Sequence, residues 1–155
     1  MAPSLPLRVL ALPLLATLAL VACDDDEGAP AAPEPELATM RITAAGQEVD
    51  VSSTGDITGG PISLDDNPAD VTVEFLEADG GPSILVTEDD FQVEAVSGST
   101  GLFTVTRTGP FTFTFTSVSS GTTTVGLALV HLSEEHTDFG PFNVPVEVNA
   151  GGNPN

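Results

Sequence analysis

The hexapeptide Phe111–Thr116 constrains the fold more than any other stretch of this chain. It reads FTFTFT, so three phenylalanines and three threonines alternate with a period of two. Because successive side chains of a β-strand point to opposite faces of a sheet, this alternation predicts a strand with one apolar and one polar face. Such a strand is typical of an antiparallel sheet that has water on one side.

The same period of two continues through most of residues 39–149, where Val, Ile, Thr and Phe are common and Gly and Pro recur at short intervals. No stretch has the 3.6-residue apolar spacing of a helix. We expect about seven to nine short strands, which predict an all-β, antiparallel β-sandwich. Residues 124–132 are expected to form a hairpin with Phe111–Thr116, and Pro145 is expected to place the last strand at a sheet edge.

The number and spacing of these strands resemble the immunoglobulin-like sandwiches that bacterial surface proteins display. The chain has no Trp, no Tyr and a single Cys, so the Cys–Trp–Cys signature and the tyrosine corner of antibody domains are missing. The resemblance therefore implies an architecture and specifies no ligand.

The beginning of the chain has a different character. Arg8 precedes an apolar run over residues 9–21, which is the pattern of a secretory signal peptide. The run ends at Leu20-Val21-Ala22-Cys23, a motif that resembles the lipobox of bacterial lipoproteins. The resemblance implies that residues 1–22 are removed and that acyl chains on Cys23 anchor the protein to the inner or outer membrane. A plain secretory signal and an uncleaved anchor are the alternatives.

The cysteine count agrees with this interpretation. Cys23 is the only cysteine, so no internal disulfide can form, and lipidation would remove a reactive thiol from an exported protein. The rest of the segment 23–38 is acidic and rich in Pro and Ala, which predicts a disordered tether. Residues 150–155 are expected to form a flexible tail. Asp24 resembles the inner-membrane retention signal of enteric lipoproteins, and the choice of membrane stays open.

The net charge restricts the partners. The chain carries 23 acidic residues against 3 basic ones, a formal charge of −20, and it has no lysine. Such a chain repels phosphate backbones and anionic lipid headgroups, so we expect no nucleic-acid partner. The expected partners are the membrane, through the acyl chains, and an unknown envelope protein or ligand.

Both histidines lie in one segment between the last two predicted strands, with the sequence HLSEEHTD. The side chains of this segment could supply three or four ligands to Zn²⁺ or Cu²⁺. These candidates are His131, Glu134, Glu135, His136 and Asp138. The parity of the preceding strand turns His131 inward, whereas His136 is expected in the loop. One alternative is a polar hairpin with two ordinary histidines, and another is a protonation switch at about pH 6.5.

A second set of candidate ligands is acidic and lies in predicted turns. It consists of Asp65, Asp66, Asp70 and Asp79. Calcium takes six to eight oxygen ligands, and loops at one end of a sandwich could supply them together. The spacing differs from that of an EF-hand, so the site would be a weak one, and solvated turn carboxylates are the alternative.

No catalytic motif is present. The chain has no G-x-S-x-G, no P-loop and no G-x-G-x-x-G, and the histidine spacing matches neither HExxH nor HxxEH. We therefore predict a non-catalytic module for binding or structural display at the cell envelope. Metal binding or sensing by the segment His131–His136 is the alternative function, and a hydrolase that uses the same histidines is a third.

Overall fold

The computed structural model describes residues 36–65, 68–97 and 101–149, which belong to one compact unit spanning Pro33–Asn155. The predicted signal peptide, Cys23 and the predicted tail lie outside the described residues, as does Asp66. A search of the described part of the chain for membrane-spanning helices finds none.

The described residues form ten strands and no helix. The strands are β1 (Leu37–Ala44), β2 (Gln47–Ser52), β3 (Ile57–Thr58), β4 (Ile62–Leu64), β5 (Ala69–Glu77), β6 (Phe91–Ser97), β7 (Phe103–Gly109), β8 (Thr112–Ser117), β9 (Gly121–His131) and β10 (His136–Val148). The count exceeds the seven to nine that we expected because β3 and β4 are segments of only two and three residues.

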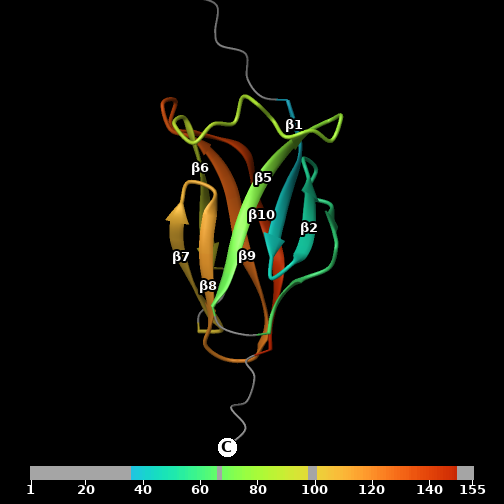
Figure 1. The fold of residues 1–155 in the computed structure, drawn as a ribbon, viewed down its shortest axis with the longest axis vertical. Helices are drawn as coiled ribbons and strands as arrows, with labels where there is room; N and C mark the ends of the chain where they lie inside the picture. Colours follow the sequence, from blue (N-terminus) through green and yellow to red (C-terminus); the bar gives the residue numbers. More distant parts are fainter. Residues whose placement is uncertain (1–35, 66–67, 98–100, 150–155) are drawn as a thin grey trace, which may run out of the picture. The chain divides into compact units, whose positions relative to one another are not determined.

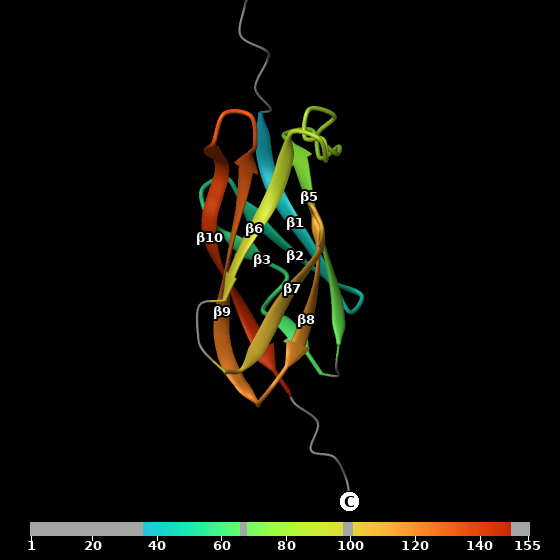
Figure 2. The ribbon, with the colours of Figure 1, turned by 90° about the vertical axis from the view of Figure 1, so that its left-hand side faces the viewer.

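The strands form two sheets that pack face to face (Figures 1 and 2). The six-stranded sheet has the order β3-β2-β1-β5-β8-β7, and the four-stranded sheet has the order β4-β10-β9-β6. All pairs are antiparallel except β4 with β10. The prediction of an all-β, antiparallel sandwich is therefore confirmed.

The strand order is that of an immunoglobulin-like sandwich. In the constant type, strands A, B, E and D form one sheet, and strands C, F and G form the other. Here β1-β5-β8-β7 and β6-β9-β10 reproduce these two orders. Beyond them, β2 and β3 extend the first sheet past β1, and the short β4 joins the second sheet beside β10.

The alternation of Phe and Thr has the predicted consequence. Phe113 and Phe115 are buried between the sheets, and the threonines of β8 lie on the opposite face, where they are only partly buried. The facing sheet contributes Val125, Leu127 and Leu129, which are fully buried. Apolar side chains from both sheets thus form one continuous core.

The predicted hairpin between residues 111–116 and 124–132 was wrong. β8 pairs with β5 and β7 in one sheet, whereas β9 pairs with β6 and β10 in the other. The chain therefore crosses from one sheet to the other between β8 and β9. Strands that follow each other along the chain can pair side by side or face each other across a core, and alternation does not distinguish the two arrangements.

β10 is longer than we expected from the sequence. It begins at His136, so this residue lies on a strand and not in a loop. β4 pairs only with Val146–Val148, and the described residues pair no other strand with that side of β10. Pro145 directly precedes the paired stretch, so the predicted edge position applies only to the part of β10 before Val146, and β4 forms the edge beyond it.

Candidate metal centre

The candidate site is built on the turn that joins β9 to β10, at the end of the sandwich where β1 begins (Figures 1 and 2). His131 ends β9, His136 begins β10, and the two residues pair directly across the hairpin. Directly opposed residues of an antiparallel pair point to the same face with their Cβ atoms about 4.5–5.5 Å apart. The two imidazole rings accordingly lie with their centroids 5.5 Å apart. The turn itself brings the two histidines together.

The ring of His131 is held in place by β6. Phe91 pairs with His131 on the side opposite to β10. The two rings stack with centroids 4.4 Å apart and an interplanar angle of 21°. The His131 side chain is only 15% exposed. Sequence reasoning missed the role of Phe91, because no local pattern links two residues that lie on separate strands.

Asp138 is the extra residue of a β-bulge. Thr137 pairs with Val130 and Phe139 pairs with Leu129, so Asp138 has no opposite residue on β9. Bulges re-aim side chains, and the Asp138 side chain is turned inward until only 10% of it is exposed. Its Oδ1 contacts Nε2 of His136 at ion-pair distance. This contact occupies Nε2 and leaves Nδ1 as the ligand atom that the ring of His136 can offer.

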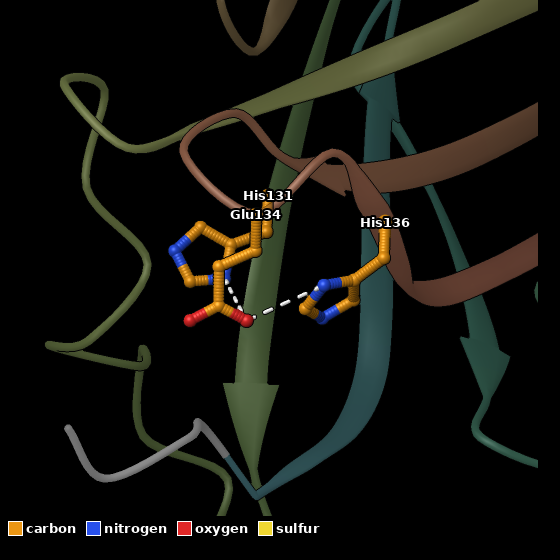
Figure 3. Close-up of side chains that lie close together, drawn as sticks. All are labelled: His131, Glu134 and His136. Carbon is orange, nitrogen blue, oxygen red and sulfur yellow. Dashed lines mark ion pairs between the residues drawn. The ribbon is translucent and has the colours of Figure 1, made fainter. Parts of the chain in front are cut away.

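Three ligand atoms converge on one point at the turn (Figure 3). Glu134 Oε2 lies 3.4 Å from His136 Nδ1 and 3.8 Å from His131 Nδ1. All three residues offer ligand atoms within 4.8 Å of one another. Bonds of about 2.0–2.1 Å in a tetrahedral zinc site separate neighbouring ligands by about 3.3 Å. Small side-chain movements would therefore give the spacing that a metal ion requires.

Two buried atoms of the cluster have no hydrogen-bond partner. They are Nδ1 of His131 and Oδ2 of Asp138, and they lie 3.7 Å apart. Leaving a buried polar group unpaired costs about 1–3 kcal/mol, so native proteins rarely tolerate it without a reason. A cation beside His131 Nδ1 would give both atoms a favourable interaction.

The basic residues of the described part of the chain lie elsewhere. Arg107 donates a 3.4 Å hydrogen bond to Gln92 and lies over the ring of Phe113. Arg41 forms a two-point ion pair with Asp50, with distances of 2.8 and 2.9 Å. The hydrogen bonds and charge of this pair raise the pKa of Arg41 and lower that of Asp50. Neither Arg41 nor Arg107, the two arginines that the structure describes, is paired with the carboxylates at the β9–β10 turn.

The remaining sequence candidates do not join this cluster. Glu135 is exposed and has a positive φ of 55°, which helps the turn to close. Among the described residues, the one group of three or more His, Cys, Asp or Glu side chains with ligand spacing is His131, Glu134 and His136.

The acidic calcium candidates that the structure describes, Asp65, Asp70 and Asp79, do not form one group with ligand spacing. Asp70 is the second residue of β5, whereas Asp79 lies in the turn after the other end of this nine-residue strand, which is about 30 Å long. Asp65 accepts a hydrogen bond from the Asn149 side chain, and Asp70 accepts one from Thr114. The described members of this set therefore do not share a site.

A groove of about 390 Å³ lies on the outer face of the four-stranded sheet. Its floor is formed by the small residues Gly126 and Ala128 of β9, with Val96 of β6 on one side and Pro141 and Asn143 of β10 on the other. Val96 is 67% exposed. The groove is separate from the core, because none of its lining residues belongs to the buried hydrophobic cluster between the sheets.

The donor set at the turn defines a class of site. Two imidazoles and a carboxylate suit borderline transition-metal ions such as Zn²⁺ and Cu²⁺, whereas Ca²⁺ and Mg²⁺ prefer oxygen ligands alone. No protein-family model, curated protein or solved structure matches this chain. The function must therefore be argued from the residues themselves.

Proposed function

We propose that this chain is a lipid-anchored, extracytoplasmic protein of the cell envelope whose β-sandwich binds Zn²⁺ or Cu²⁺ at the β9–β10 turn. His131 Nδ1, His136 Nδ1 and the Glu134 carboxylate are the ligands, and Asp138 orients His136. The proposed role is metal binding without catalysis.

One observation carries this proposal. His131 Nδ1 and Asp138 Oδ2 are buried, lack hydrogen-bond partners and lie 3.7 Å apart. An apolar pair at the same positions would avoid the cost of burying them. A divalent cation would compensate that cost, and its charge of two matches the two carboxylates of Glu134 and Asp138.

The anchor is proposed from the sequence. The lipobox-like motif Leu20-Val21-Ala22-Cys23 follows an apolar run directly, and the chain contains no other cysteine. Residues 24–36 could extend at most about 45 Å. This length is the upper limit of the distance between a lipidated Cys23 and the start of β1.

Thermal unfolding of the purified full-length chain tests metal binding. We expect Zn²⁺ or Cu²⁺ to raise the melting temperature by several degrees relative to a chelator, because an ion at about 100 times its Kd adds about 2.7 kcal/mol. His131→Ala and His136→Ala should abolish the shift. Glu135→Gln is the matched control, since this residue lies in the same turn outside the cluster. A shift that survives both histidine changes, or the absence of any shift, would refute the assignment.

Metabolic labelling with a radioactive fatty acid tests the anchor separately. Wild-type protein should carry label and sediment with membranes, and Cys23→Ser should lose both properties. Label that persists in Cys23→Ser would show that the lipid is attached elsewhere.

The outer-face groove favours a second candidate function, the binding of another envelope component by the four-stranded sheet. A photo-crosslinking residue placed at Val96, beside the groove, should capture a partner in intact cells. The same residue at Val118, which is 59% exposed and does not line the groove, is the control. Equal capture at both positions would argue against a specific surface.

A further inference from the structure

The candidate metal site has one protected side and one open side. His131 and Asp138 are 15% and 10% exposed, and the Phe91 ring stacks on His131. Glu134 and His136 are 54% and 42% exposed. An ion held between these residues would therefore be shielded on the side of β6 and accessible between Glu134 and His136.

The number of protein ligands also indicates that the site is open on one side. The group with ligand spacing contains three residues, and Asp138 is not among them. Its Oδ1 contacts His136 Nε2, and its Oδ2 lies 3.7 Å from His131 Nδ1 without belonging to the group with ligand spacing. Asp138 therefore acts as a positioning residue and as a negative charge beside the ion. Structural zinc sites use four protein ligands, whereas sites with three keep a position for water or another ligand.

We propose that the bound ion keeps its fourth position open towards solvent and that this position takes a neutral nitrogen donor, such as an imidazole group. The proposal rests on the metal-binding function proposed above. In the exchange, one water molecule leaves the ion as the nitrogen lone pair binds. No electron is transferred, and the oxidation state of the ion does not change.

Charge argues for a neutral donor over an anionic one. Glu134 and Asp138 already balance a divalent ion, and a carboxylate as fourth ligand would add a further negative charge. The whole chain has a formal charge of −20, which repels anions at the surface. A neutral nitrogen meets no such repulsion, and imidazole suits the same ions.

The test uses the full-length protein loaded with Co²⁺, whose visible absorption reports the coordination of the ion. Imidazole and acetate are titrated separately at constant pH and ionic strength. We expect imidazole to change the cobalt bands saturably, with a half-saturating concentration at least about tenfold below that of acetate. Ultrafiltration checks that cobalt stays on the protein.

Asp138→Asn tests whether the preference for imidazole over acetate comes from the charge near the ion or from the metal itself. Removing one negative charge near the ion should reduce the preference for imidazole over acetate about threefold or more. Glu135→Gln also removes one charge, but from an exposed side chain outside the cluster, and should leave the preference nearly unchanged.

The outcomes distinguish the two proposals. If no cobalt bands form, the metal-binding function itself fails. If cobalt binds but imidazole leaves its bands unchanged or strips the ion from the protein, the site is closed and the open fourth position is wrong. If acetate binds as well as imidazole, the position is open but the neutral-donor assignment is overturned.

Discussion

Two hairpins of the sandwich each bring a pair of polar residues directly opposite each other. In the β1–β2 hairpin, Arg41 pairs with Asp50, and in the β9–β10 hairpin, His131 pairs with His136. The first pair is complete, since the guanidinium donates two hydrogen bonds to the carboxylate. The second is incomplete, because Nδ1 of His131 has no hydrogen-bond partner.

The backbone of the β1–β2 hairpin is also regular, whereas that of the β9–β10 hairpin is irregular. β1 and β2 pair in unbroken register and are joined by Ala45 and Gly46, which both have positive φ, as in the tight turns that best suit hairpins. β9 and β10 are joined by four residues, and β10 contains two register shifts. A regular hairpin is sufficient for a pair that stabilises the fold. The irregular one leaves Asp138 without an opposite residue and leaves two buried polar atoms without hydrogen-bond partners, which agrees with the metal site that we propose.

We expect the largest difference between the hairpins in the loss of stability when one glycine of each is replaced by alanine. Gly140 has φ of +88°, and an added Cβ would lie 2.7 Å from the Leu127 carbonyl oxygen. Gly46 has φ of +80°, but nothing lies within 4 Å of its added Cβ. We expect Gly140→Ala to cost about 3 kcal/mol and Gly46→Ala about 1 kcal/mol in urea unfolding. Equal costs would show that the bulged stretch of β10 is not tightly constrained.

We expect metal binding to increase the difference in stability between the hairpins, because the ion should stabilise the β9–β10 hairpin and not the β1–β2 hairpin. At about 100 times its Kd, Zn²⁺ or Cu²⁺ should slow amide exchange in residues 130–139 by up to about 100-fold wherever exchange requires local opening of the site. The β1–β2 hairpin should show much less change. Mass spectrometry of peptic fragments measures this, and uniform protection of both hairpins would contradict a local site.

The same chemical change should have opposite effects in the two hairpins. Without metal, Asp138→Asn removes a charge from a buried carboxylate with an unpartnered oxygen, and the amide can donate to His131 Nδ1. We therefore expect a gain of about 1 kcal/mol in the free energy of unfolding. Asp50→Asn breaks a complete ion pair and should lower the melting temperature. The measurement is unfolding in chelator, and a loss of stability in Asp138→Asn would show that this carboxylate already has a favourable environment.

The sequence predicts the two hairpins unequally. Alternation identified the sandwich and the inward parity of the strand that ends at His131. It did not place His136 on a strand, because the apolar pattern of β10 resumes only near Phe142. The bulge at Asp138 and the stacking of Phe91 depend on pairing between strands, which one-dimensional patterns do not encode. Acidic residues that looked equivalent in the sequence, such as Asp70 and Asp79, proved to lie near opposite ends of one strand.

The smallest effect concerns the pH dependence of the complete pair. Its hydrogen bonds and charge lower the pKa of Asp50 in the folded state below the ordinary value of 3.8. A carboxyl group with a depressed folded pKa binds protons more readily when unfolded, so it stabilises the fold above its unfolded pKa. This contribution should disappear as the pH falls from about 5 through the folded pKa. Because both side chains are about one third exposed, solvent weakens the pair, and we expect a difference of only about 2 °C in melting temperature.

Asp50→Asn isolates this contribution. The melting temperatures of wild type and variant should differ at pH 6 and converge as the pH falls below the folded pKa of Asp50. Thr43→Ser, on the same strand as Arg41 and without a titrating group, is the control and should follow the wild-type profile. If the gap between wild type and Asp50→Asn were independent of pH, the carboxylate would contribute through packing. The contrast between the Arg41–Asp50 pair and the proposed metal cluster would then rest on the β9–β10 hairpin alone.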